Sequence, residues 1–164
     1  MREVAEHLET EAKRRSKNVD DVNLFARSAF NRYYYATFLL ARELMKKFRP
    51  SWRGSHSALP KELTGSILRE IKQLKKKANR LHDWEIVSQC DVCIHHIHQL
   101  SELLESAYGL RVIADYEPEI TATIDVGGTI TLGDKKISDA KHWVEQAISL
   151  KGKIETFWDN SNGY

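Results

Sequence analysis

The chain has 164 residues, of which 41% are hydrophobic and 29% are charged, and its formal net charge is +2. That length suits one domain, and the hydrophobic fraction excludes a globally disordered chain. No apolar stretch approaches the roughly 18 residues that a membrane span needs. The start of the chain lacks the apolar core of a secretory signal, and Cys90 and Cys93 are too few for a disulfide framework. We therefore expect a cytoplasmic protein with no membrane partner.

Charge is distributed unevenly along the chain. Residues 1–82 carry 19 basic and 9 acidic side chains, whereas residues 83–164 carry 6 and 14. This division favours either a polyanion-binding face or association between copies of the chain. The alternative interpretation is an ordinary mixed surface, on which the basic and acidic residues happen to fall in different halves of the sequence.

The first half of the chain has the hydrophobic periodicity of helices. We expect one helix over 2–16 and a second over 22–48, with Asp20 or Asp21 as its N-cap and Pro50 beyond its end. The second helix is apolar on almost every side, which is typical of a central helix packed by several neighbours. The Pro-, Gly- and Ser-containing stretch that follows, up to residue 65, predicts a loop with at most a short turn.

The second half continues the helical pattern and then changes period. Ser66 opens a third predicted helix, and a fourth is expected over 84–108, with Gly109 at its end. Alternating residues and a Gly-Gly turn predict a β-hairpin over 120–132. We expect Ser138 to cap a last helix.

The sequence therefore predicts an all-α antiparallel bundle of about five helices with a small β-hairpin insertion. A single domain is expected over 1–158, with a frayed tail over 159–164.

Cysteines and histidines cluster on the fourth predicted helix in a pattern that resembles a metal site. Cys90 and Cys93 fall on its apolar stripe, whereas His95 and His98 fall on another face. Because zinc needs ligands that converge on one point, we favour a structural role for the cysteines and expect neither a metal nor another cofactor.

A basic face follows the third predicted helix. Its members are Arg69, Lys72, Lys75, Lys76 and Arg80, and no acidic residue interrupts the run from Lys72 to Arg80. Such a face can bind phosphates by releasing counterions, or it can be an ordinary solvated helix face.

Arg32 stands out because it lies among aromatic residues on the central helix. A guanidinium cannot be buried without a partner, so it needs a carboxylate, a carbonyl or a ligand phosphate. A structural ion pair with Asp115 is the favoured interpretation, and a catalytic or phosphate-binding arginine is the alternative.

The segment Asn31-Arg32-Tyr33-Tyr34-Tyr35-Ala36-Thr37-Phe38 resembles the S-R-A-Y-Y-A-x-F-H signature of HEPN-domain proteins. It is closest to the small prokaryotic HEPN subgroup often encoded beside nucleotidyltransferases. Gly54-Ser55-His56-Ser57-Ala58-Leu59 resembles the K-H-S-G-L loop of that subgroup, and Leu110-Arg111-Val112-Ile113-Ala114-Asp115-Tyr116 resembles its L-R-x-x-A-D-Y element. The three motifs occur in the same order as in the family.

The resemblance implies a dimeric helical bundle that binds RNA or nucleotides, and in many members a metal-independent ribonuclease of toxin–antitoxin or phage-defence systems. Family catalysts carry an R-x4–6-H motif on a late helix, which is missing here. The pairs with that spacing are Arg2–His7 and Arg49–His56, and only the second includes the histidine of the subgroup loop.

Two functional hypotheses follow from the resemblance. The first is a ribonuclease or toxin-like effector in which Arg32, His56 and Arg111 act on a phosphate. The second is a non-catalytic module that binds RNA, a nucleotide or a partner protein such as a nucleotidyltransferase. In either case Tyr34, Tyr35, Asp115 and Tyr116 are expected to support the bundle or its pocket, and we expect a homodimer.

Overall fold

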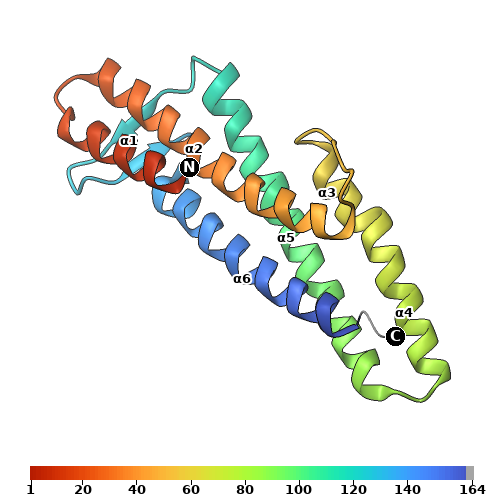
Figure 1. Ribbon diagram of the computed structural model, residues 1–164. Helices are drawn as coiled ribbons and strands as arrows, with labels where there is room; N and C mark the ends of the chain where they lie inside the picture. Colours follow the sequence, from red (N-terminus) through yellow and green to blue (C-terminus); the bar gives the residue numbers. More distant parts are fainter. Residues whose placement is uncertain (162–164) are drawn as a thin grey trace. The chain divides into compact units, whose positions relative to one another are not determined.

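Helices dominate the computed structural model, which describes residues 1–161 (Figure 1). The helices are α1 (Arg2–Arg14), α2 (Val19–Phe48), α3 (Ala58–Glu62), the π-helical turn η1 (Leu63–Ile67), α4 (Leu68–Arg80), α5 (Trp84–Tyr116) and α6 (Ile137–Ser161). The predicted class, an all-α bundle with a small β insertion, is confirmed. No helix within residues 1–161 has the length and hydropathy needed to span a membrane.

The start of α2 lies three residues before the predicted one. The side-chain oxygen of Asn18 accepts the backbone N–H groups of Asp20 and Asp21 at 3.0 and 3.2 Å. Asn18 therefore supplies the cap that we had expected from an aspartate, since its side chain satisfies two first-turn donors.

The segment before α4 is more helical than predicted. Leu59, Leu63 and Ile67 recur every four residues and are completely buried. Pro60 is compatible with this helix because it lies in the first turn, where its missing N–H has no helical acceptor. Apolar burial outweighs the Pro and Gly signals that predicted a loop up to residue 65.

Helix α5 continues two turns beyond the predicted end. Gly109 lies within the helix, where a side chain would meet no atom within 4 Å. Burial of Leu110 and Ala114 on the next turns carries the helix past this glycine. The Arg111–Tyr116 segment is therefore the last part of α5.

The predicted hairpin is present and has a third strand. β1 (Ala122–Ile124) pairs antiparallel with β2 (Ile130–Leu132), which pairs with β3 (Lys135–Lys136). The connection from β1 to β2 is longer than the two-residue turn expected, because Asp125 accepts hydrogen bonds from the backbone N–H groups of Gly128 and Thr129. Gly128 has φ 78°, which a glycine adopts without strain.

Contacts divide the chain into two compact units. Unit 1 comprises residues 1–39 and 106–146, and unit 2 comprises residues 40–105 and 147–164. The core of unit 1 includes Phe30, Tyr33, Tyr34, Leu110, Ile130 and Leu132. The core of unit 2 includes Leu44, Met45, Leu59, Leu63, Ile67, Ile71, Ile97, Leu100 and Ile154. Residues 159–161 continue α6, and the rest of the predicted frayed tail lies outside the described residues.

Candidate functional site

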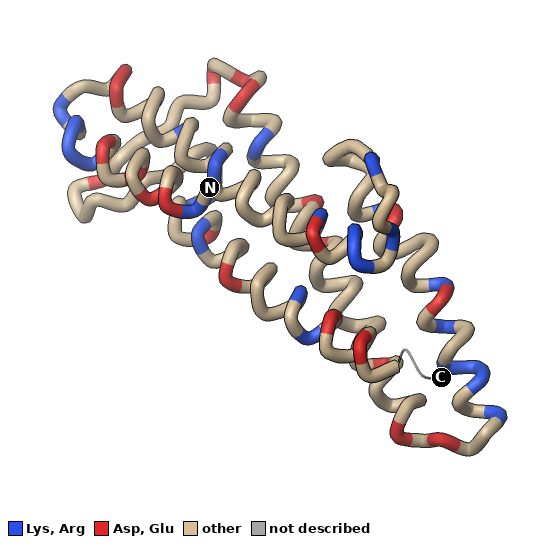
Figure 2. The backbone as a smooth tube through the Cα atoms, viewed as in Figure 1, with Lys and Arg blue, Asp and Glu red and all other residues tan. Residues whose placement is uncertain are grey.

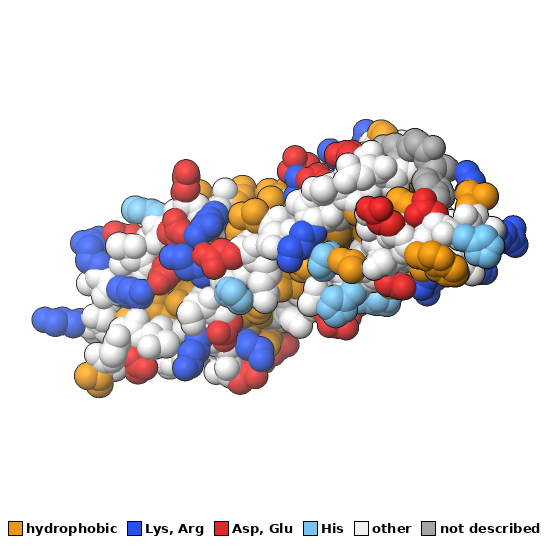
Figure 3. Space-filling view, turned by 90° about the horizontal axis from the view of Figure 1, so that it is seen from below, with side chains coloured by type: hydrophobic (Ala, Val, Ile, Leu, Met, Phe, Trp, Pro, Cys, Tyr) orange, Lys and Arg blue, Asp and Glu red, His pale blue; other side chains and the backbone are white. Residues whose placement is uncertain are grey.

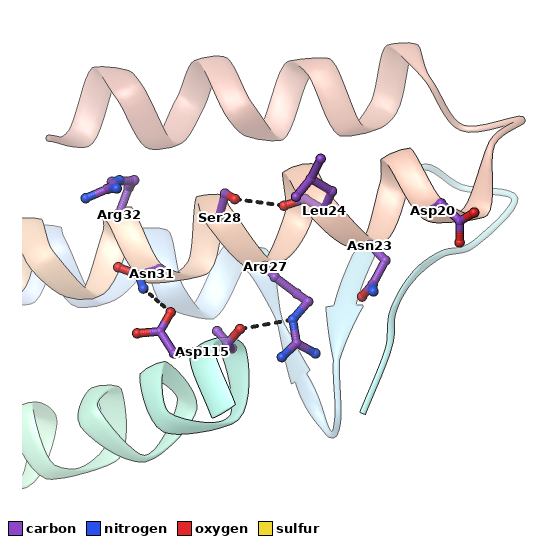
Figure 4. Close-up of a pocket in the computed structure, with 9 residues that line it drawn as sticks. Asp20, Asn23, Leu24, Arg27, Ser28, Asn31, Arg32 and Asp115 are labelled. Carbon is purple, nitrogen blue, oxygen red and sulfur yellow. Dashed lines mark hydrogen bonds between the residues drawn. The ribbon is translucent and has the colours of Figure 1, made fainter. Parts of the chain in front are cut away.

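Unit 1 contains a polar pocket of about 470 Å³ beside α2 and the end of α5 (Figure 4). It is lined by Asp20, Asn23, Leu24, Arg27, Ser28, Asn31, Arg32, Ala114 and Asp115. Asn23, Arg27 and Asn31 follow one another at four-residue intervals, so they lie on one face of α2. The pocket brings together Arg32 and Asp115, two of the residues singled out from the sequence.

Arg27 is a pocket residue that the sequence analysis missed. Its guanidinium donates to the carbonyl oxygens of Ile113, Ala114, Glu117 and Ile120 at 2.8, 2.9, 3.1 and 2.5 Å. These carbonyls lie at or just beyond the end of α5, where the regular helical hydrogen bonds run out. Two of them also accept backbone N–H groups, Ile113 from Glu117 at 3.3 Å and Glu117 from Ile120 at 3.1 Å. Arg27 therefore caps α5, and its four-residue spacing from Asn23 and Asn31 was the available sequence signal.

Asp115 has other partners than the one predicted. One carboxylate oxygen accepts a hydrogen bond from the Nδ2 of Asn31, and the other lies 2.9 Å from the Nε of Arg111. Within residues 1–161, no ion pair joins Asp115 to Arg32. Arg111 takes that place because it lies four residues earlier on the same helix face.

Arg32 is half-buried rather than enclosed in the core. Its guanidinium carbon lies 5.7 Å from the centre of the Tyr35 ring. In the described part of the chain it forms no ion pair with a carboxylate. A cation–π contact at an accessible position stabilises its charge, so Arg32 can reach a ligand without first breaking a salt bridge.

Arg111 and Tyr116 form the other side of this cluster. The Nη2 of Arg111 donates to the Tyr116 hydroxyl at 3.4 Å, and its guanidinium carbon lies 5.1 Å from the Tyr116 ring centre. Burial lowers the pKa of Arg111, but the Tyr116 hydroxyl and Asp115 raise it above its usual value. The guanidinium is therefore permanently charged, while 65% of Tyr116 is exposed.

Two polar atoms of this cluster are buried without a hydrogen-bond partner: the Oδ1 of Asn31 and the Nε of Arg111. The Nε nevertheless lies 2.9 Å from a carboxylate oxygen of Asp115, which balances its charge. An unsatisfied buried polar atom costs about 1–3 kcal/mol. Such groups are few in folded proteins, and a catalytic role or an ordered water is among the explanations for them.

Tyr34 and Tyr35 differ in burial. Tyr34 is buried, and its ring centre lies 5.6 Å from that of Tyr35 and 6.0 Å from that of Tyr108. Burial raises the pKa of Tyr34 well above its usual range. Tyr34 is therefore a neutral phenol that packs α2 against α5, whereas the half-buried Tyr35 supports Arg32.

His56 belongs to unit 2, in the connection between α2 and α3. It is half-buried. Arg32, Arg111 and Asp115 belong to unit 1, so a composite site of these residues with His56 stays a prediction.

The predicted basic face lies on α4, where Figure 2 marks its Lys and Arg positions. Arg69, Lys72, Lys76 and Arg80 are exposed, follow one side of the helix, and form no ion pair within the described residues. We call these four residues the α4 basic stripe. Lys75 differs, because its ammonium contacts both carboxylate oxygens of Asp91 at 2.5 and 2.7 Å.

Cys90 and Cys93 are buried on α5, as their place on the apolar stripe indicated. Burial raises the pKa of Cys93 to about 12, with a smaller contribution from Cys90, so its thiol is protonated at neutral pH. His95 and His98 are exposed on other faces. Among residues 1–161, no three His, Cys, Asp or Glu side chains converge as metal ligands would.

No family model, curated protein or solved structure matches the chain. The likeness to HEPN domains rests on the three sequence motifs and stays a prediction.

Proposed function

We propose that the protein binds RNA and cleaves it as a metal-independent ribonuclease, in the manner of a toxin-like or phage-defence effector. One observation carries this proposal: Arg32, which no carboxylate within residues 1–161 neutralises, lines a pocket with Asp115, the residue that holds Arg111. Guanidinium groups bind phosphate oxygens through planar, paired hydrogen bonds. The Tyr116 hydroxyl adds a further polar group beside Arg111.

These groups suit an internal phosphoryl transfer. In that reaction the 2′-hydroxyl of RNA attacks the adjacent phosphorus and gives up its proton, while the bond from phosphorus to the 5′-oxygen breaks. The products are a 2′,3′-cyclic phosphate and a 5′-hydroxyl, whose proton comes from solvent. Arg32 and Arg111 would stabilise the charge that develops on phosphorus. The motif resemblance predicts His56 as the acceptor of the 2′-hydroxyl proton.

The α4 basic stripe supports RNA binding from a second position. Its four unpaired cations would contact the phosphate backbone over several nucleotides, independent of sequence. Lys75 contributes less in this proposal, because Asp91 already neutralises it.

Cleavage of a labelled single-stranded RNA in the presence of EDTA tests the catalytic proposal. We expect cyclic-phosphate products from the unmodified protein and a loss of at least 100-fold in rate for Arg32→Lys and for His56→Ala, since a general base alone contributes about that factor. His7→Ala is the matched control, because His7 is exposed on α1 and should leave the rate unchanged. Equal rates in all variants would refute these assignments.

A non-catalytic RNA- or nucleotide-binding module is the second candidate. One contact favours this second function. Arg111, one of the two arginines proposed for catalysis, already forms an ion pair with Asp115. RNA binding without cleavage would support this function. A homodimer, or a complex with a nucleotidyltransferase, belongs to either proposal, and light scattering at micromolar concentration tests the dimer.

RNA binding itself is tested through the α4 basic stripe. Reversing Lys72 and Lys76 to glutamate should weaken binding and lower the slope of log affinity against log salt by about 1.4, at about 0.7 for each phosphate contact on a single strand. The control is a double variant, Lys17→Glu with Lys46→Glu. It changes the net charge by the same amount, at exposed positions outside the α4 basic stripe. An identical slope in both double variants would rule out a specific role for the stripe.

A further inference from the structure

Unit 2 contains a groove of about 740 Å³ between the first half of α5 and the second half of α6. Ser88, Val92 and His96 line it from α5 at four-residue intervals, and Gly152 and Thr156 line it from α6 at the same spacing. The α6 residues of the groove extend from 148 to 160, which corresponds to about 18 Å of helix.

Aliphatic side chains of this groove are open to solvent. Val92 is 53% exposed and Ile148 is 49% exposed, although both are large and hydrophobic. In Figure 3, hydrophobic side chains reach the surface beside histidines. Because Val92 and Ile148 line the same groove, one apolar occupant would cover both side chains.

The formal charge that lines the groove is positive. Lys153 lines it, no Asp or Glu does, and Lys153 forms no ion pair within residues 1–161. The neighbouring Lys151, by contrast, lies 3.0 Å from Glu155 and 3.6 Å from Glu43. Burial, and then Lys153, lower the pKa of His96, so this histidine is neutral at pH 7. An occupant of the groove therefore needs an apolar surface and an anion near Lys153.

A second copy of the same groove does not meet this requirement. A two-fold interface places the same surface on both sides. Both copies of Lys153 would then be buried in the interface. The groove has no carboxylate that could pair with either of them. The occupant must bring acidic groups that this surface lacks.

We propose that this groove binds an amphipathic helix of a partner protein, with aliphatic side chains on one face and a carboxylate that pairs with Lys153. Three turns of such a helix match the length of the groove. Its aliphatic residues would cover Val92 and Ile148. Gly152 has no side chain and would allow the two helix backbones to approach closely.

A fluorescein-labelled 14-residue helical peptide tests this proposal by anisotropy with the full chain. The peptide carries leucines at positions i, i+4, i+7 and i+11 and glutamates beside them, and a second peptide has lysines in place of the glutamates. We expect saturable binding of the glutamate peptide and at least tenfold weaker binding of the lysine peptide. Lys153→Glu should reverse that order.

Gly152→Leu provides a variant that blocks the groove without disturbing the fold. A Cβ at Gly152 would meet no atom within 4 Å, so the new side chain can occupy the groove. It should reduce peptide affinity at least tenfold with an unchanged circular dichroism spectrum. Gly109→Leu is the matched control, because Gly109 is also helical with open space around its Cβ but lies outside the groove.

Three results would overturn the proposal. The first is an absence of saturable binding by the glutamate peptide, or equal affinity for both peptides. The second is saturable binding of dodecanoate that Gly152→Leu abolishes, together with no peptide binding, which would make the groove a lipid site. The third is a halved mass in light scattering for Ile148→Asp, which would assign the groove to a second copy of the chain. RNA binding by Gly152→Leu should stay unchanged, so this proposal can fail independently of the proposed function.

Discussion

Replacing Arg27 by alanine should destabilise unit 1 more than the loss of a surface arginine would. Arg27 donates four hydrogen bonds to carbonyl oxygens at and beyond the end of α5. A hydrogen bond from a charged donor contributes about 1.5–3 kcal/mol, but water can replace part of this set at a helix end that is only partly buried. We therefore expect a loss of about 2–4 kcal/mol in the free energy of unfolding, rather than the sum of four full bonds.

Urea unfolding followed by circular dichroism measures this loss. Hydrogen exchange should also become faster at residues 113–120, because the end of α5 loses its cap. Arg27→Lys should recover about 1 kcal/mol, since an ammonium can reach one or two carbonyls but not all four. Arg69→Ala, on the exposed face of α4, should change the stability by no more than about 0.5 kcal/mol. A loss below about 1 kcal/mol for Arg27→Ala would refute the capping role.

Further predictions concern the other parts of the fold. Tyr33→Phe should cost about 1.5–3 kcal/mol in urea unfolding, because the buried Tyr33 hydroxyl donates to the Glu9 carboxylate at 2.9 Å; a neutral effect would show that this bond is dispensable. Hydrogen bonds from Arg14 hold the pKa of Glu11 at about 2. The stability that Glu11 contributes is therefore present above its unfolded pKa, the reference value of 4.5, and is lost as pH falls toward 2. Glu11→Gln should thus be less stable than the unmodified protein at pH 7, and the difference should shrink below pH 4.5 and vanish only below about pH 2. A constant difference across this range would contradict the assignment. Iodoacetamide at pH 8 should leave Cys93 unmodified in the folded protein and alkylate it in urea, as mass spectrometry can verify; rapid labelling without urea would refute the burial of this thiol.

Periodicity was sufficient to predict the long helices and the hairpin, because their apolar spacing reflects the faces they bury. It failed where tertiary packing outweighed a local signal. Gly109 was expected to end α5, yet burial of Leu110 and Ala114 continues the helix. The Pro- and Gly-containing stretch before α4 became helical because Leu59 and Leu63 are buried.

The polar pocket was predicted only in part. Arg32 and Asp115 were identified from composition and motif, and both line the pocket. Their partners could not be predicted from the sequence. Whether Asp115 pairs with Arg32 or with Arg111 depends on where α5 ends. Once the Arg111–Tyr116 segment is helical, Arg111 lies one turn before Asp115 and takes the carboxylate.

The division of the chain into two units has a consequence for its synthesis. Each unit is assembled from segments that are not contiguous, since residues 1–39 join residues 106–146 and residues 40–105 join residues 147–164. A ribosome releases the chain from its N-terminus, so Phe30 and Tyr33 emerge long before the residues that complete their core. Unit 1 cannot finish folding before residues 106–146 have been made, and unit 2 cannot finish before the segment that begins at residue 147 has been made. The apolar residues of α2 stay available to chaperones during that interval.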